Sequence, residues 1–546
     1  MDKVLILDSV DEKAAEILSN AGFHVDAFDT KNTPPPEKLK TIISEYAAVI
    51  VRSNTKITPD ILNAATNLKV IGRAGSGVDN IAVPSATAKG ILVMNADGNT
   101  ISAAEHALAM MMALSRNITV ADVSMKEGRW DKKHLTGVEV NNKTLGIFGL
   151  GRVGKALAER AIGLNMTVLA YDPFLSKEAA EKVGVTLVDN KEDLLKKADF
   201  ISLHTVKLDE YILGSKEFSQ CKKGVRIINC ARDGLMDSEA LLEAVEKGIV
   251  AGVALDVFEN EPLEKGKGNP FEEKLVGLQC VIATPHLGAS TSDAQVRVAE
   301  MIATQVRNYL TDGTIAGAVN APSLTAEERS KLGAHLMLAS QLGSFVGQIM
   351  PEGRLQKIDI DYAGGVAEVN RKPVTSAAVE WLLRSQNIQA NQINALAIAK
   401  DRSIAIEETV VSDEKNYQTL IRIRVETDKG TTQVAGTLIN KEPSIVSVDD
   451  IQLEAKIAGH MLFARNNNKP GMIGIISTIL GVSGLNIKNI QMGETPDKTE
   501  NISFFAVDRE ITQPVLAELI EAKQDGVKEV RVLNMSPLIP VRDCQP

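Results

Sequence analysis

Three polar side chains of types that cooperate in oxidation chemistry follow three apolar runs of the sequence. Arg232, Glu261 and His286 each come shortly after a run typical of a buried strand. Removing a hydride from a 2-hydroxy acid requires a base for the hydroxyl proton, a carboxylate that orients the base, and a cation that holds the substrate carboxylate. Imidazole, carboxylate and guanidinium groups fit these needs in turn. We therefore predict that His286, Glu261 and Arg232 are catalytic, although each alone is more often structural or solvated.

A glycine pattern upstream of these residues is typical of a dinucleotide site. Gly149, Gly151 and Gly154 are spaced as G-x-G-x-x-G after an apolar run, and the next run ends in Asp172. The first glycine permits a tight turn, the second lets the backbone approach a pyrophosphate, and the third lets a helix pack closely on the sheet. The helix N-terminus favours the phosphates. Asp172 favours NAD over NADP, because a carboxylate repels a 2′-phosphate. The alternative is a glycine-rich turn that binds no nucleotide.

The elements that must position these residues form two series of apolar runs, separated by a helical stretch at about 100–127. Near-continuous apolar runs that alternate with amphipathic segments predict parallel sheets built from β-α-β units. Because the carboxyl ends of parallel strands share one edge, the polar residues and the glycine turn are expected at that edge. A helix at 290–310 is expected to return to the first domain. The predicted strands lie at 3–8, 47–52, 68–73, 91–96, 144–151, 167–172, 185–188, 200–205, 225–231, 251–258 and 281–286.

The chain changes character after about residue 317. An amphipathic helix at 323–350 and alternating strands at 355–364, 417–427 and 431–440 predict an α+β module. From about residue 459 the order β-α-β-β-α-β predicts a ferredoxin-like unit. The predicted domains are a substrate-binding domain at 1–98 completed by 292–316, an NAD-binding Rossmann-like domain at 99–291, a regulatory domain at 317–457 and the ferredoxin-like domain at 458–546.

The composition excludes several classes of partner. The net charge of -10 gives no general attraction for nucleic acid or anionic lipid, so an anionic substrate needs a local cluster of cations. The four cysteines form no C-x-x-C pair and no metal-ligand spacing with histidine, which predicts no metal site and a reducing, cytoplasmic environment. The apolar stretch 106–115 is too short to cross a bilayer, and the N-terminus is typical of a first strand and helix rather than a signal peptide.

Several stretches resemble the signatures of the D-isomer-specific 2-hydroxy-acid dehydrogenase family. They are the glycine turn, Asp172 and the segments 229–232, 254–262 and 285–291, and the resemblance covers roughly residues 1–316. It implies that Arg232, Glu261 and His286 occupy the family's catalytic positions. The sequence departs from the family at Asp233, where glycine is common, and in the stretch after Thr205. The resemblance also implies NAD contacts at Ser76, Arg152, Val153, Thr205, Cys230, Ala231, Arg232, Asp256, His286, Leu287, Gly288 and Ala289.

Two arginines in the first domain add positive charge for a second anionic group on the substrate. Arg52 and Arg73 both follow strand-like runs, and the backbone N–H groups of the loop with Ser76 and Gly77 can bind a carboxylate. These stretches resemble those of family members that act on phosphorylated hydroxy acids, in which the matching arginines lie at the anionic groups. The alternative is that both arginines form salt bridges within their own domain.

The segment from about residue 459 resembles an ACT domain, a regulatory module that often binds amino acids between two copies. The resemblance implies that Asn468 and Asn486 bind the ammonium and carboxylate groups of an L-serine effector. It is weakened at Asn466, where some relatives have histidine. The alternative is a module that only joins two chains.

A basic stretch at 128–134 also bears on assembly. It matches a segment that lies near the active site of a partner subunit in relatives, which implies a role for Arg129, Lys132 and Lys133 across a subunit interface. The alternative is a solvated basic turn. We predict a homo-oligomer, either a dimer or a tetramer.

The residues and the resemblance together predict the NAD-dependent oxidation of 3-phospho-D-glycerate to 3-phosphohydroxypyruvate, the first step of L-serine biosynthesis. The module at about 317–457 resembles the extra regulatory domain found in long members of the family. Two other functions stay open. A glycerate or hydroxypyruvate reductase would need neither Arg52 nor Arg73, and a non-catalytic NAD-sensing protein would not need the Arg, Glu and His set.

Overall fold

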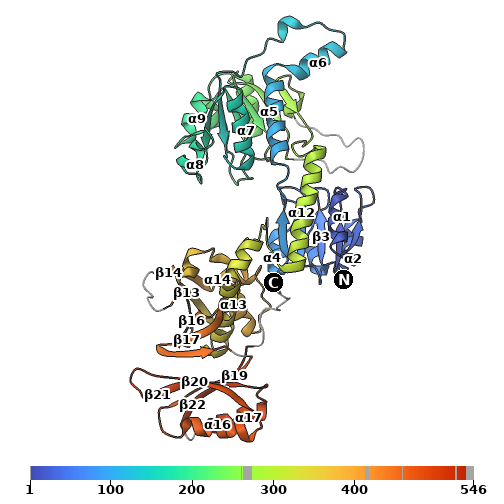
Figure 1. Ribbon diagram of the computed structural model, residues 1–546. Helices are drawn as coiled ribbons and strands as arrows, with labels where there is room; N and C mark the ends of the chain where they lie inside the picture. The colour runs from blue at the N-terminus through green and yellow to red at the C-terminus, as the bar shows by residue number, and fades with distance from the viewer. Residues whose placement is uncertain are drawn as a thin grey trace.

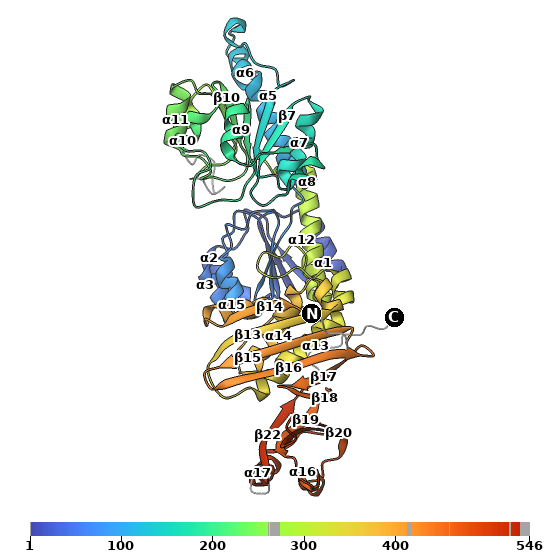
Figure 2. The same ribbon diagram turned by 90° about the vertical axis from the view of Figure 1, so that its left-hand side faces the viewer.

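The computed structural model describes residues 2–259, 261, 274–411, 417–457, 459–522 and 526–535. Four sheets follow one another along an elongated molecule. Figures 1 and 2 show the lobe that carries the second sheet at one end and the C-terminal lobe at the other. Two parallel sheets, one mixed sheet and one antiparallel sheet confirm the predicted fold class.

The first sheet is parallel, and its strand order β2-β1-β3-β4-β5 is that of flavodoxin-like folds. The strand at its centre, β3, is apolar throughout, and every residue of it is buried. The edge strand β2 escapes prediction because its sequence His-Val-Asp-Ala has no fully buried residue and no apolar run. The elements are β1 Lys3–Ile6, α1 Lys13–Asn20, β2 His24–Ala27, α2 Pro36–Ile42, β3 Ala48–Val51, α3 Pro59–Ala64, β4 Val70–Arg73, α4 Val83–Ala88 and β5 Leu92–Asn95.

The second sheet is also parallel, with the order β12-β11-β10-β9-β6-β7-β8. Strands β6 to β11 have the doubly wound order of dinucleotide-binding folds, and β12 extends one edge. All seven strands overlap predicted apolar runs. The elements are β6 Thr144–Phe148, α7 Arg152–Gly163, β7 Thr167–Tyr171, α8 Lys177–Glu181, β8 Thr186–Leu187, α9 Lys191–Lys197, β9 Phe200–Leu203, α10 Ser215–Gln220, β10 Val225–Asn229, α11 Ser238–Glu246, β11 Val250–Leu255 and β12 Val281–Ala283.

Two helices connect the parallel sheets (Figure 1). Helix α5 Thr100–Ser115 leads into the second sheet, and α12 Ser292–Asp312 returns to the first, as predicted for 290–310. The return is close, because a Cβ on Gly72 of β4 would lie 2.8 Å from the Ile302 side chain of α12. Helix α6 Ile118–Lys126 follows α5 and projects from the lobe. The chain therefore crosses twice between the domains that hold the predicted site.

The third sheet is mixed, because β13 pairs parallel with β14 and antiparallel with β15. Helix α13 packs on it and lies so close to α14 that a Cβ on Gly343 would come within 2.1 Å of Ala378 O. The predicted helix at 323–350 is therefore confirmed in type and extent. The elements are α13 Ala326–Ile349, β13 Leu355–Gly364, α14 Lys372–Ser385, α15 Ala395–Asp401, β14 Ala405–Val410, β15 Thr419–Thr427, β16 Gly430–Ile439, β17 Glu442–Val448 and β18 Ile451–Lys456.

The C-terminal sheet is antiparallel, with the order β20-β21-β19-β22, and it follows the predicted β-α-β-β-α-β sequence of elements. One cluster of buried apolar side chains runs from the first sheet through α12 and the third sheet to Phe463 and Phe504 of the last one. No helix of the described residues is both long and apolar enough to cross a membrane. The elements are β19 His460–Asn467, α16 Met472–Val482, β20 Ile487–Glu494, β21 Glu500–Val507, α17 Gln513–Glu521 and β22 Val527–Asn534.

Candidate active site

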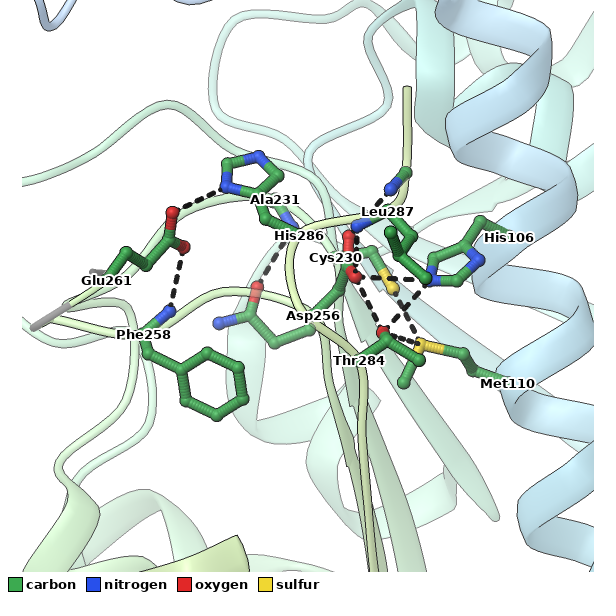
Figure 3. Close-up of polar contacts among 12 residues, drawn as sticks. His106, Met110, Cys230, Ala231, Asp256, Phe258, Glu261, Thr284, His286 and Leu287 are labelled. Atoms are coloured by element: carbon green, nitrogen blue, oxygen red, sulfur yellow. Dashed lines mark hydrogen bonds and ion pairs between the residues drawn. The ribbon is translucent and has the colours of Figure 1, made fainter. Parts of the chain in front are cut away.

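The predicted base and its carboxylate partner are in direct contact. His286 follows β12 and Glu261 follows β11, and His286 Nδ1 lies 2.8 Å from Glu261 Oε2 (Figure 3). The other oxygen of Glu261 accepts a hydrogen bond from Phe258 N at 3.1 Å, which fixes the carboxylate. Because a carboxylate only accepts, Nδ1 carries the proton and Nε2 keeps its lone pair. The imidazole is thus arranged to accept a proton at Nε2.

This contact raises the pKa of His286 above its ordinary value. The hydrogen bond to Glu261 is the main cause, while partial burial and the positive charge of Arg232 act in the opposite direction. The side chain of His286 is 52% exposed, so a small molecule can reach it. A raised pKa makes the imidazole a stronger base for a hydroxyl proton.

Arg232 lies where the two parallel-sheet domains meet. Its Nε is 3.6 Å from Asp79 Oδ2 of the first domain, and its Nη1 donates to Ala231 O at 2.7 Å. A Cβ on Gly77 would come within 2.8 Å of Arg232 Nη2, so glycine leaves room for the guanidinium. Asn229 Nδ2 donates to Arg232 O at 2.9 Å and holds the loop after β10. The structure therefore brings together Gly77 and Arg232, which the sequence suggested separately.

Arg73 is a half-buried cation whose pKa two other arginines affect. Burial lowers the pKa of Arg73 to about 10, and the charges of Arg52 and Arg232 act in the same direction. Its Nε is buried and has no hydrogen-bond partner within the described residues. Asp79 and Asp8 act in the opposite direction, and positive charges that affect one another favour a bound anion. For Arg73 this geometry supports the predicted anion contact rather than an internal salt bridge.

The glycine turn has the geometry that its spacing predicts. Gly149 has a φ of 87°, and a Cβ there would lie 2.8 Å from His204 O. A Cβ on Gly154 would lie 2.3 Å from Gly149 O, so helix α7 packs tightly on the turn. A Cβ on Gly151 would meet no atom of the described residues within 4 Å, which leaves open space at the N-terminus of α7. A pyrophosphate fits this space, because the helix N-terminus offers free N–H groups there.

Asp172 and Thr205 flank this turn. One oxygen of Asp172 accepts from Leu150 N and the other from Phe174 N, at 2.9 and 3.0 Å. A carboxylate has about four lone-pair sites, so both oxygens can still accept from ribose hydroxyls. The Thr205 hydroxyl is buried without a hydrogen-bond partner in the described part of the chain. Arg152, at the first position of α7, forms an ion pair with Asp97.

The structure gives Asp256 a more internal position than a cofactor contact requires. Its carboxylate is fully buried and accepts hydrogen bonds from Leu287 N and Gly288 N at 2.7 and 2.9 Å. It thereby holds the predicted cofactor loop 286–289 from behind. Direct contact between Asp256 and NAD stays a prediction.

One group of side chains within the described residues has the spacing of a metal site. The ligand atoms of His106, Cys230 and Asp256 lie within 4.8 Å of one another. Burial raises the pKa of the Cys230 thiol, and this thiol donates to Met110 Sδ at 3.5 Å. The oxygens of Asp256 already accept four donors. Hydrogen bonding therefore accounts for this cluster without an ion.

The two predicted effector residues lie apart in the single chain. Asn468 Nδ2 donates to Lys498 O at 3.1 Å near the end of β20, whereas Asn486 N donates to Asp508 Oδ1 at the start of that strand. The eight residues of β20 separate them, a span of about 25 Å at roughly 3.3 Å per residue. A serine site that uses both residues therefore needs two copies of the domain, as the resemblance implies, and it stays a prediction.

The sequence did not reveal the residues that bind the loops of the candidate site and hold them in place. His106 and Thr284 bind Asp256, Asn99 Oδ1 accepts from Ser76 Oγ at 2.6 Å, and Asp8 binds the loop with Arg52. Asp8 directly follows the first apolar run, so the rule that selected Arg232 and His286 would also have selected it. His106 lies within an apolar helix and gives no such signal.

Comparisons with known proteins identify the class of the fold. Residues 108–288 match the family model of the D-isomer specific 2-hydroxyacid dehydrogenase NAD binding domain, and residues 331–449 match that of the D-3-phosphoglycerate dehydrogenase intervening domain. The chain resembles a D-lactate dehydrogenase from Aquifex aeolicus, solved with NAD and lactic acid, with a TM-score of 0.51 and 26% identity over 59% of this chain and 100% of that one. Fold and site thus define an NAD-dependent dehydrogenase of the 2-hydroxyacid class, and the match confirms NAD as the cofactor.

Relatives that match almost the whole chain identify the family within this class of dehydrogenases. The chain is 39% identical to a D-3-phosphoglycerate dehydrogenase from a Synechocystis strain, over 98% of this chain and 95% of the relative. It is 37% identical to one from Methanocaldococcus jannaschii, over 98% of this chain and 100% of the relative. The chain belongs to the D-3-phosphoglycerate dehydrogenase family, in the long form that carries the intervening domain.

Proposed function

We propose that this protein oxidises 3-phospho-D-glycerate to 3-phosphohydroxypyruvate with NAD, as the first step of L-serine biosynthesis. The observation that carries the proposal is the His286–Glu261 pair, which lies beside a cluster of Arg232, Arg73 and Arg52. The substrate offers a hydroxyl to the base and two anionic groups to the arginines. The names of the full-length relatives support the same substrate.

Each of these residues has a role in the proposed reaction. His286 takes the hydroxyl proton at Nε2, and Glu261 stabilises the imidazolium that forms. Arg232 binds the substrate carboxylate with its fork of N–H donors. Arg73, Arg52 and the loop of Ser76 and Gly77 bind the second anionic group. NAD, when bound, accepts the hydride.

The same chain has residues that fit NAD. The open space at Gly151 and the unpartnered hydroxyl of Thr205 suit the pyrophosphate, and Asp172 suits the ribose hydroxyls. Loop 286–289 and the segment after β10 suit the nicotinamide side of the cofactor. The proposed cofactor residues are Ser76, Gly149, Gly151, Arg152, Val153, Gly154, Asp172, Thr205, Cys230, Ala231, Arg232, Asp256, His286, Leu287, Gly288 and Ala289.

We also propose that the protein forms a homo-oligomer. Apolar side chains stand exposed on and after α6, including Ile118, Val123, Met125 and Trp130, of which Trp130 is 79% exposed. A patch of this kind favours a subunit interface. The adjacent Arg129 pairs with Asp131 at 3.1 Å within its own chain, so Lys132 and Lys133 are the better candidates to reach a partner's site. Light scattering of the purified protein tests whether it is a dimer or a tetramer.

We further propose that L-serine regulates the enzyme and that the enzyme is cytoplasmic. A serine site built from Asn468 of one copy and Asn486 of another requires the dimer of C-terminal domains, and steady-state assays with and without L-serine test it. The four-domain division at 1–98 with 292–316, 99–291, 317–457 and 458–546 can be tested by limited proteolysis. Three free cysteines among the described residues agree with a reducing cytoplasm.

The central experiment replaces the base. His286→Ala is expected to lower kcat for NADH formation from 3-phosphoglycerate by about 10²–10⁴-fold, while fluorescence titration still detects NADH binding. His24→Ala, which removes an exposed imidazole of the first domain, is the matched control. Turnover that survives in His286→Ala, or activity on glycerate but on no phosphorylated acid, would contradict the proposal.

A pH profile tests the role of Glu261. Oxidation needs neutral His286, whose pKa Glu261 raises, so the acidic limb of kcat/KM should lie above the ordinary histidine value of about 6.5. Glu261→Gln removes the charge, lowers the pKa of His286 and should move this limb to lower pH while the plateau of kcat falls. An acidic limb that does not move would exclude Glu261 as the partner of the base.

A further inference from the structure

A buried hydrogen-bond network lies directly behind the loop that carries His286 (Figure 3). At its centre is the carboxylate of Asp256, whose Oδ1 accepts from Thr284 Oγ1 at 2.6 Å and from Leu287 N at 2.7 Å. The same oxygen lies 3.2 Å from His106 Nε2, and Oδ2 accepts from Gly288 N at 2.9 Å. Helix α5, the end of β12 and the following loop therefore converge on one carboxylate.

His106 enters this network as a hydrogen-bond donor. An ionised carboxylate only accepts, and Thr284 gives its hydroxyl proton to Asp256. The Nε2 of His106 must therefore carry a proton, which it shares between Asp256 and the Thr284 oxygen 3.1 Å away. Burial opposes the ionisation of Asp256, but its hydrogen bonds, that of His106 first, outweigh burial and lower its pKa. Its donors thus bind a charged acceptor, which makes these hydrogen bonds stronger than neutral ones.

The backbone held by this network is unusual at His286 itself. His286 has a φ of 55°, in the left-handed region that few residues other than glycine adopt. The next two N–H groups, of Leu287 and Gly288, both donate to Asp256. The N–H of His286 donates to Thr284 O at 3.0 Å. Such a conformation persists only where its surroundings hold it.

We infer that His106 is a positioning residue for His286 and acts through Asp256. His106 on α5 holds the carboxylate of Asp256 in place by a hydrogen bond. That carboxylate binds the two backbone N–H groups after His286. The backbone of this loop then keeps the imidazole of His286 in contact with Glu261. The inference rests on the proposed role of His286 as the base. A displacement of about 1 Å at a reacting group can lower the rate 10²-fold. The loss of His106 is therefore expected to slow the proton transfer to His286.

Two other roles for the cluster predict different behaviour. The proposed contact between Asp256 and NAD is compatible with the positioning role, but if it were the only role of the cluster, the loss of His106 would raise only the KM for NAD. A metal held by His106, Cys230 and Asp256 would make activity depend on that metal. The positioning role instead predicts a loss of kcat together with a change in the pH dependence of His286.

The test compares His106→Leu with His106→Gln in the full-length protein. Glutamine offers an amide N–H near the position of Nε2, whereas leucine fills the space and donates nothing. His106→Leu is expected to lower kcat for 3-phosphoglycerate oxidation by about 10²-fold with little change in KM for NAD, and His106→Gln to restore most of it. The acidic limb of kcat/KM should move to lower pH in His106→Leu, because a displaced His286 loses the hydrogen bond that raises its pKa.

Controls separate this role from general damage. Met111→Leu repacks a buried position of the same helix and is expected to retain kcat. An equal loss in both His106 variants, a loss confined to KM for NAD, or an acidic limb that stays in place would overturn the inference. If His286→Ala retains turnover, the proposed function fails. If His286→Ala is inactive while His106→Leu is fully active, only the positioning role fails.

Discussion

The loops that carry Arg52 and His286 are built on the same plan in two different domains. In each, an aspartate within two residues of the end of a strand binds the loop that follows the neighbouring strand. Asp8 accepts from Arg52 N at 3.0 Å and from Thr55 N at 2.9 Å, and it is buried. Asp256 accepts from two backbone N–H groups in the loop of His286. A buried carboxylate thus fixes a functional loop in both sheets.

The two loops differ in where the strain and the extra support lie. In the first domain Asp8 itself and the next residue, Ser9, are left-handed, with φ values of 66° and 53°, whereas Arg52 is not. The second support there is local, because Asn80 Nδ2 donates to Arg52 O and Thr55 O at 2.7 and 2.6 Å. In the second domain His286 is the left-handed residue, and the extra support comes from His106 on α5.

This difference indicates what each loop is built to do. A loop that binds an anion can be fixed by side chains nearer to it in the sequence, because the position of a charge tolerates small errors. A base that transfers a proton needs closer placement. The extra support of the His286 loop comes from α5, which belongs to the same predicted domain but is distant in the sequence. The position of the proposed base therefore depends on how α5 packs against this loop.

Of the variants that test this comparison, the one that disrupts the loop of His286 is expected to have the largest effect on kcat. Asp256→Asn places an amide N–H among four donors, so at least one of them loses its acceptor. We expect kcat to fall by about 10²-fold and the free energy of unfolding to fall by about 1–3 kcal/mol. Steady-state kinetics and urea denaturation measure the two. A normal kcat in this variant would show that the position of His286 does not depend on Asp256.

A smaller and different effect is expected in the first loop. Asp8→Asn removes the negative charge that Arg52 N and Thr55 N bind through Oδ2, and it places an amide NH2 against the Thr55 hydroxyl that donates to Oδ1. It therefore disturbs the loop of a proposed binding residue rather than that of the proposed base. KM for 3-phosphoglycerate should rise about tenfold, which corresponds to ~1.4 kcal/mol, with kcat and KM for NAD nearly unchanged. Asp60→Asn, at an exposed aspartate of the same domain, serves as the control. A fall in kcat without a rise in KM would mean that the two loops do not differ in role.

The smallest expected effect compares two hydroxyls. Thr55 Oγ1 donates to Asp8 and Thr284 Oγ1 donates to Asp256, both at 2.6 Å. Replacing either threonine by valine removes one hydrogen bond and should lower the free energy of unfolding by about 1 kcal/mol. Only Thr284→Val should also lower kcat, by a few-fold. Equal kinetic effects from the two variants would argue against the contrast between the loops.

Much of the fold could be predicted from the sequence, because its signals are local. Buried parallel strands are continuous apolar runs, and all seven strands of the second sheet overlap such runs. The edge strands β2 and β14 were not predicted, because an exposed edge needs no apolar run. The roles of Gly149 and Gly154 could also be read from their spacing, since each depends on space within one turn.

Residue types and their spacing were enough to indicate which side chains are available for the proposed chemistry: a histidine, a glutamate and an arginine after three strands, and a glycine turn before a helix. The tertiary structure alone decided that His106 binds Asp256, which is 150 residues away, and that Gly77 lies against Arg232. It also decided that Asn468 and Asn486 lie at opposite ends of one strand. The physical reason is that residue type and spacing constrain only neighbours along the chain. Contacts between distant segments depend on how the helices and sheets pack.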